Sequence, residues 1–182
     1  MIIILSQKID SVSAYSGDEV FKVYHYPARY RNQIHAGDIF IYYQGNRYDK
    51  SQRYYFGMGR IGTIYQKDED NYYAELEDVI KFDRKVPIYL PDGGYVEQLG
   101  YETIRNSINP PWQSSIRPLS ESAYRYILNA AGGKEIIESC NDKLKKAIQN
   151  YYISGDKTAV LEILSIAKRL ANLYGLQESS DE

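Results

Sequence analysis

The sequence predicts an α+β protein: a strongly curved mixed sheet or small β-barrel with flanking helices, followed by a C-terminal helical extension. Short apolar or alternating segments fill the first half of the chain, as strands do. Two longer segments, residues 136–152 and 158–174, have apolar residues at helical spacing. Glycines at 57, 59 and 62 interrupt an alternating segment, which indicates a strand that bends tightly or lies close to other backbone. Strands followed by a helical end fit helices packed on one sheet.

The first elements are defined by short apolar runs. Residues 2–5 are predicted to form a central strand because they are uniformly apolar. Residues 18–24 alternate and predict either a strand or a short helix. Residues 28–34 predict a helical turn with Pro27 at its first position, where helices tolerate proline. Residues 39–43 predict a strong strand.

The middle of the chain predicts further strands. Residues 54–65 alternate around the three glycines, and residues 72–82 alternate in part. Residues 86–90 and 95–99 flank the sequence PDGG, which predicts a hairpin. Residues 101–106 are expected to form a short helix.

The second half is predicted to be helical after one loop, NPPWQSSIRPLS. Ser120 is a helix cap, and the helix that follows should end at Gly132-Gly133. This divides the chain into a domain at 1–133 and an extension or connector at 134–182, whose last residues we expect to be disordered. One face of the last helix is predicted to be apolar: Val160, Leu161, Leu164, Ala167, Leu170, Ala171 and Tyr174.

Composition limits the chemistry. The 182 residues include one cysteine and two histidines, which excludes an intramolecular disulfide and a cysteine zinc site. We therefore expect no cofactor and no metal. No apolar run is long enough to cross a bilayer, so we expect a soluble, cytoplasmic protein without a membrane partner.

No set of residues predicts catalysis. GMGRIG at 57–62 has the G-x-G-x-x-G spacing, but its surroundings alternate as a strand, whereas a dinucleotide site needs a helix to begin there. Cys140 lies in a helical segment and is interpreted as a small buried residue. His25 and His35 are interpreted as hydrogen-bonding surface residues. We expect a binding module rather than an enzyme.

Aromatic and cationic residues favour binding to nucleic acid. The chain has 20 tyrosines, and the net charge of −2 hides a basic segment at 24–65. Aromatic rings stack on bases, guanidinium groups contact phosphates, and amides read base edges. In this segment the charged residues are mostly cations: Arg29, Arg31, Arg47, Lys50, Arg53 and Arg60 against Asp38 and Asp49. Arg47, Lys50 and Arg53 share one loop, which predicts contacts with phosphates.

Several ordered motifs resemble a known family. YPARYRNQIHAGDIFIYYQG, YYFGMGRIG, NYYAEL, VPIYLP and SIRPLS, over about residues 1–131, look like an EVE-like domain of the PUA superfamily. More specifically, the chain is similar to the N-terminal readers that precede HNH nucleases or NTPase motors in modification-dependent restriction systems. The resemblance implies a curved β-barrel that accepts a modified, often methylated, base flipped out of DNA. It also implies an HNH nuclease or NTPase effector, in cis or in trans.

The resemblance also implies the positions of site residues. Base-pocket candidates occur before, at the end of and after the strong strand: Tyr26, Tyr30, Tyr43, Gln44, Gly45, Trp112 and Ser115. Phosphate-binding candidates, chosen by their charge alone, are Arg29, Arg31, Arg47, Lys50, Arg53 and Arg117.

Two other functions stay open. One is an RNA-binding PUA-type module, which differs from a DNA reader in its recognition of the 2′-hydroxyl. The other is an interaction scaffold that forms a homodimer through the C-terminal helices, along the face between Leu161 and Leu170.

Overall fold

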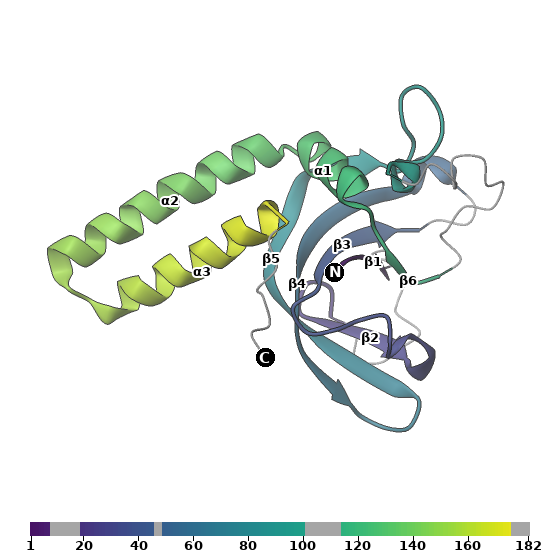
Figure 1. The fold of residues 1–182 in the computed structure, drawn as a ribbon, viewed down its shortest axis with the longest axis horizontal. Helices are drawn as coiled ribbons and strands as arrows, with labels where there is room; N and C mark the ends of the chain where they lie inside the picture. The colour runs from purple at the N-terminus through teal and green to yellow at the C-terminus, as the bar shows by residue number, and fades with distance from the viewer. Residues whose placement is uncertain (8–18, 46–48, 101–113, 176–182) are drawn as a thin grey trace.

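The protein is described by a computed structural model covering residues 1–7, 19–45, 49–100 and 114–175. These residues form an α+β fold with one strongly curled mixed sheet (Figure 1). The strands are β1 (Ile2–Gln7), β2 (Val23–Pro27), β3 (Ile39–Gln44), β4 (Tyr54–Gln66), β5 (Asn71–Pro87) and β6 (Ile116–Pro118). The helices are the 3₁₀ turns η1 (Ala28–Tyr30), η2 (Lys50–Gln52) and η3 (Val96–Gln98), and the α-helices α1 (Glu121–Ala130), α2 (Gly133–Ser154) and α3 (Lys157–Leu173).

The strand order is β2-β5-β4-β3-β1-β6. β1 and β3 run parallel, and every other neighbouring pair is antiparallel. The predicted mixed sheet is therefore confirmed. β1 lies inside the sheet, as its uniform apolarity predicts, because both faces of a central strand are covered.

The sheet curls because β4 and β5 are long and bulged. Their pairing shifts register at three points, and each bulge increases the local twist. Gly59 permits close packing at this bend: a Cβ there would lie 2.7 Å from the ring of Phe40 and 2.9 Å from the carbonyl oxygen of Glu77. The predicted role of the strand glycines in close backbone approach is confirmed.

Two apolar clusters occupy the two faces of the sheet. The inner cluster contains Tyr24 from β2 and Ile116 from β6, although these strands lie at opposite ends of the strand order. The sheet also curls until β2 approaches β1 across the gap between the two ends of the strand order. Tyr24 spans the gap directly, since its hydroxyl donates to the carbonyl oxygen of Ser6 at 3.2 Å.

The outer cluster joins the sheet to the helices. Ile41 of β3, Tyr55 of β4 and Ile127 of α1 are among its fully buried residues. The N-cap of α1 is Ser120, as predicted: its hydroxyl accepts from the amide of Ala123 at 3.1 Å. Cys140 is buried in this cluster, as predicted.

The two long helices form an antiparallel hairpin that extends away from the sheet (Figure 1). Its base is fixed by Asn172, which is fully buried. The Nε of Arg60, on β4, donates to Asn172 Oδ1 at 2.9 Å, and the hydroxyl of Tyr124 donates to the carbonyl oxygen of Asn172. The hairpin is thus held by polar contacts to both β4 and α1.

The structure differs from three sequence predictions. The hairpin predicted at PDGG is present only as one isolated antiparallel bridge between Tyr89 and Tyr95, because Val86 and Pro87 belong to the end of β5 and η3 begins at Val96. Residues 116–118 of the predicted loop form β6, which pairs with β1. The apolar face expected on α3 is divided: Leu170 packs toward the core, whereas Leu161 and Leu164 are exposed. The helix predicted at 101–106 lies outside the described residues, and within them no helix has the length and apolarity needed to cross a membrane.

Candidate nucleic-acid interface

A row of side chains crosses one edge of the sheet. Gln7 ends β1, Gln44 ends β3 and Tyr54 begins β4, and the strand register places Gln7 opposite Gln44 and Gln44 opposite Tyr54. The C-terminal ends of parallel β1 and β3 meet at this edge. Three residues from separate parts of the sequence therefore lie side by side.

This row lies on the inner face of the sheet. Side chains along a strand alternate between faces, and the inner cluster includes Leu5, Tyr42 and Tyr54. Gln7 and Gln44 are each two residues beyond an inner residue and so project to the same side. Only 6% of Gln7 and 5% of Gln44 is exposed, although glutamine is usually a surface residue. The carboxamides border an aromatic interior.

Lys85 lies beside the row, and Lys81 precedes it on β5. The ammonium group of Lys85 lies 4.3 Å from the ring centroid of Tyr54, and that of Lys81 lies 5.0 Å from the ring of Phe21. Both lysines are exposed on β5, as is Asp83 between them. Lys50 in η2 is also exposed, and Arg53 follows η2 immediately before Tyr54. The end of the row at β4 and β5 is therefore basic.

A second group of predicted residues meets at the other end of the row. The backbone amide of Ser115 donates to the hydroxyl of Tyr30 at 3.2 Å, which joins η1 to the start of β6. The guanidinium of Arg29 lies 5.0 Å from the centroid of the same ring. Burial opposes ionisation of Tyr30, but hydrogen bonds from Ser115, Ser114 and Arg29 outweigh it and lower the pKa to about 8.

Ser6 connects the two groups. Its amide donates to the carbonyl oxygen of Ser115 at 2.8 Å, and Gln7 is the next residue. The contacts therefore run along the ends of four strands without a break. We call the following residues the polar band: Arg29, Tyr30, Ser115, Gln7, Gln44, Tyr54 and Lys85.

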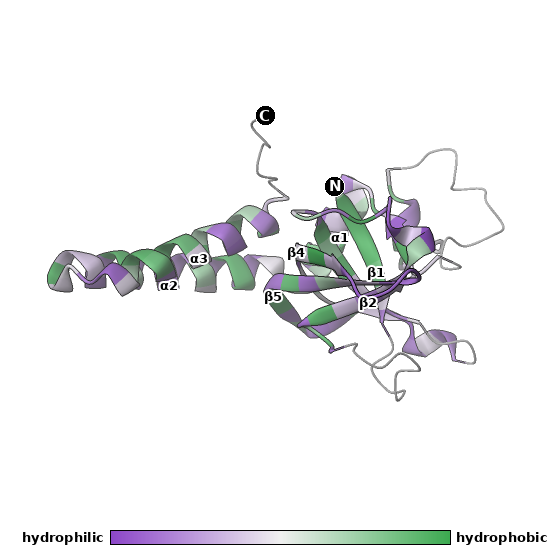
Figure 2. Ribbon diagram, turned by 90° about the horizontal axis from the view of Figure 1, so that it is seen from below, coloured by the Kyte–Doolittle hydropathy of each residue, from purple (hydrophilic) through white to green (hydrophobic). Residues whose placement is uncertain are grey.

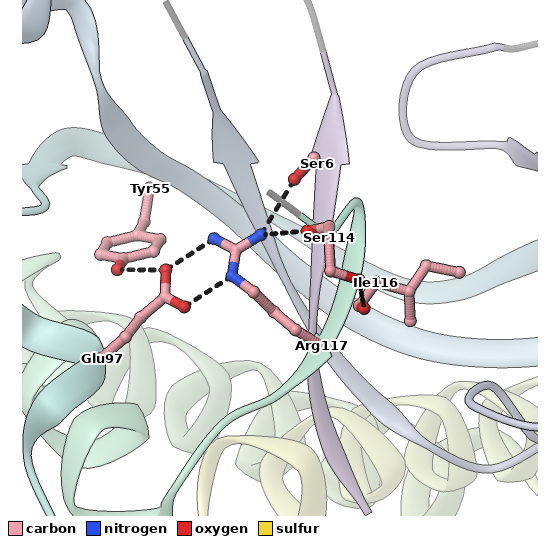
Figure 3. Close-up of polar contacts among 6 residues, drawn as sticks. All are labelled: Ser6, Tyr55, Glu97, Ser114, Ile116 and Arg117. Atoms are coloured by element: carbon pink, nitrogen blue, oxygen red, sulfur yellow. Dashed lines mark hydrogen bonds and ion pairs between the residues drawn. The ribbon is translucent and has the colours of Figure 1, made fainter. Parts of the chain in front are cut away.

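Arg117 is not part of this band, although its charge suggested a phosphate contact. It is 4% exposed and forms two hydrogen bonds of 2.6 Å with the carboxylate of Glu97, which is equally buried (Figure 3). The remaining terminal nitrogen donates to Ser6 Oγ and to the carbonyl oxygen of Ser114, both at 3.0 Å. Burial alone would lower the pKa of Arg117, but the carboxylate of Glu97 reverses this and raises it. The phosphate role is therefore corrected to a structural one.

Tyr43 lies on the opposite face of the sheet from Gln44. It belongs to the outer cluster, and the guanidinium of Arg117 lies 4.8 Å from its ring centroid. Burial raises the pKa of its hydroxyl. Gly45 directly follows β3, and a Cβ there would lie 3.2 Å from the Tyr43 ring. Tyr43 and Gln44 thus cannot form one wall, because consecutive strand residues point to opposite faces.

Tyr26 is also corrected, from the pocket entrance to the core. It is 1% exposed and packs between Tyr24 and Tyr72, with ring centroids 6.4 Å and 5.7 Å away. Burial, and then the neighbouring Tyr72, raise the pKa of its hydroxyl to about 12. Of the remaining candidates, Arg31 is exposed beside η1, and Arg47 and Trp112 lie outside the described residues.

Sequence reasoning missed Gln7, Lys81 and Lys85. Gln7 could have been found in the sequence, because it is a polar residue that closely follows a buried apolar strand. The two lysines gave no local signal, because their position depends on how β5 pairs with β4.

The side chains of the band can form hydrogen bonds with a ligand. Carboxamides offer both donors and acceptors, as base edges do. Among the described residues, no group of three His, Cys, Asp or Glu side chains could hold a metal ion. Comparison with protein-family models gives no match for this chain, and comparison with curated proteins gives none either.

Proposed function

We propose that the protein is a DNA-binding module that recognises a modified base, in the manner of an EVE-like domain of the PUA superfamily. The observation that carries this proposal is the pair of buried carboxamides, Gln7 and Gln44, at the edge of an aromatic interior and beside exposed cations. A solvated polar surface would leave such groups exposed. Buried amides next to a basic surface suit selective contact with a polar, planar ligand.

Each part of the polar band has a role in this proposal. Lys85, which faces the ring of Tyr54, attracts the phosphates together with Lys50 and Arg53, which shortly precede Tyr54 in the chain; exposed Arg29 does so at the other end. Gln44 and Gln7 read the edge of a base that leaves the duplex. Flipping costs a few kcal/mol for an intact base pair, and contacts with the rim of the band offset that cost.

The packing of the inner cluster indicates where the base would bind. Tyr24, Tyr26 and Tyr42 fill the inside of the curled sheet and are each almost fully buried. The base is therefore proposed to bind at the rim, beside Tyr54 and the two carboxamides, and not deep among the inner tyrosines. An effector such as an HNH nuclease or NTPase would supply any cleavage.

The proposal is tested by fluorescence anisotropy with one duplex in five versions: unmodified, 6-methyladenine, 5-methylcytosine, 5-hydroxymethylcytosine and 4-methylcytosine. We expect one version to bind at least about tenfold more tightly than the unmodified duplex, a difference of about 1.4 kcal/mol. A matched RNA hairpin is the competitor. Equal affinities for all five duplexes, or tighter binding of the RNA, would refute modified-DNA recognition.

A further inference from the structure

α3 has two apolar rows with heptad spacing. The first row is Ala159, Ile163, Ile166, Leu170 and Leu173. The second is displaced by one residue: Val160, Leu164, Ala167 and Ala171. In both rows the steps alternate between four and three residues. This average of about 3.5 residues is the spacing of helices that pack along their length.

Within the described residues, the first row is the one that packs against the rest of the protein. Ala159, Ile166 and Leu173 are buried, and Ile163 and Leu170 pack against the core. In the second row Val160 is 37% and Leu164 54% exposed. The helix therefore has one row that packs on α2 and a second row, about a quarter turn away, that faces outward.

α2 continues the exposed row at the free end of the hairpin. Ile148 lies about a quarter turn, and Tyr152 more than about a third of a turn, from buried α2 residues such as Cys140 and Ala147. In an antiparallel pair, residues displaced in the same rotational sense lie on the same side of the hairpin. Ile148 and Tyr152 are both exposed, and hydrophobic residues (green) extend to the free end in Figure 2. We call Ile148, Tyr152, Val160 and Leu164 the hairpin face.

The charges beside the hairpin face are mainly positive, apart from Asp156, the N-cap of α3, whose carboxylate accepts from the amide of Thr158. Lys157 and Lys168 flank the second row of α3, and neither forms an ion pair within the described part of the chain. Glu162 is the one carboxylate in the sequence of α3 and lies on the opposite side of the helix from Leu164. Lys145, on the α2 side, has Asp142 at 3.8 Å. An apolar row flanked by lysines is complementary to an apolar row flanked by carboxylates.

We propose that the hairpin face docks an amphipathic helix of a partner protein, with an apolar heptad row flanked by Glu or Asp. A second copy of this chain fits less well. Packing two α3 helices along their second rows brings Lys157 and Lys168 to a shared interface and leaves each Glu162 turned away. The like charges then oppose association.

The contacts at the base of the hairpin make such docking directional. Arg60 and Tyr124 both bind Asn172, so α3 is held to the sheet at the end opposite the free tip. A partner helix on the hairpin face would consequently have a defined orientation relative to the sheet. The proposal uses no residue of the polar band and is independent of the proposed function.

The test uses two fluorescent synthetic peptides of about three heptads, each with Leu and Ile in the apolar row. One has Glu at the flanking positions and the other has Lys. We expect the Glu peptide to bind the full chain at least tenfold more tightly than the Lys peptide. Leu164→Gln should weaken Glu-peptide binding at least tenfold, whereas the control Glu162→Gln should leave it within twofold.

Charge reversal makes the test specific. K157E/K168E should reverse the preference, so that the Lys peptide binds more tightly than the Glu peptide. Circular dichroism checks that each variant is folded. We expect all of them to fold, because the substituted positions are exposed. Equal binding of both peptides, or a preference that survives the reversal, would overturn the proposal. If light scattering showed that the wild-type chain is a dimer and that Leu164→Gln is a monomer, the proposal would also be overturned, and the hairpin face would bind a second copy of the chain.

Discussion

Removing the charge of Glu97 tests whether Arg117 is structural. Glu97→Gln keeps the side-chain volume, and its Oε1 can still accept one hydrogen bond from Arg117. The second bond is lost, because the new amide group turns N–H donors toward the guanidinium. A hydrogen bond to a charged group contributes about 1.5–3 kcal/mol. Here the guanidinium also stays buried without its counter-ion, which makes the total loss about 3–5 kcal/mol.

The measurement is urea unfolding monitored by circular dichroism, with the free energy of unfolding obtained by linear extrapolation. Since domains of this kind are stable by about 5–15 kcal/mol, the variant should lose a large part of its stability. The matched control is Glu135→Gln, which removes an exposed carboxylate 3.8 Å from Arg84. Exposed pairs of this kind contribute about 0–1 kcal/mol, so the control should unfold close to wild type.

A double-mutant cycle completes the test. Arg117→Met and Glu97→Gln together should cost clearly less than the sum of the single changes, because the double variant leaves no unpaired charge. A loss under about 1 kcal/mol for Glu97→Gln would refute the buried ion pair. It would also return Arg117 to the residues that could bind phosphate.

Three further predictions concern the band and the sheet. Subtracting the absorbance titration of Tyr30→Phe from that of wild type should show one tyrosine ionising near pH 8. Because this pKa lies below the ordinary value of 10.0, ionised Tyr30 adds to the free energy of unfolding fully above pH 10, and this contribution is lost as pH falls through 8. The contribution should be absent in Tyr30→Phe. Ionisation of Tyr30 near pH 10 would contradict the hydrogen bonds described above. Lys85→Gln should weaken binding of every duplex and reduce the salt dependence of that binding. The control is Lys67→Gln, whose ammonium group likewise lies over a tyrosine ring, that of Tyr73, and which should change neither quantity. Equal effects of the two substitutions would contradict a local phosphate contact at Lys85. Gly59→Ala should lower the free energy of unfolding by about 1–3 kcal/mol because its Cβ would collide with neighbouring atoms, and an unchanged urea midpoint would contradict the close packing.

Local patterns in the sequence predicted those elements that depend on neighbouring residues. The strand at 39–43, the cap at Ser120 and the two long helices all follow from spacing and helix-end chemistry. The curl of the sheet followed from the glycines in β4. β6 was missed because a strand of three residues has too few positions to show alternation.

The candidate site was harder to predict because its geometry depends on distant contacts. Arg117 looks like any cation in sequence, and only folding places the carboxylate of Glu97 against it. The alternation of β2 shows that Tyr24 and Tyr26 share a face, but not that this face is the closed interior. Likewise, both apolar rows of α3 are visible in the sequence, and only the position of α2 determines which one is buried.

The most direct test of the central claim is the ratio of affinities for the preferred modified duplex and the unmodified duplex in Gln44→Leu. Gln66→Ala, at the far end of β4, is the matched control for loss of a carboxamide. If Gln44 reads the base edge, the ratio in Gln44→Leu should fall from at least tenfold to about one, with affinity for the unmodified duplex nearly unchanged. A ratio that stays at the wild-type value in Gln44→Leu would contradict base recognition at the polar band.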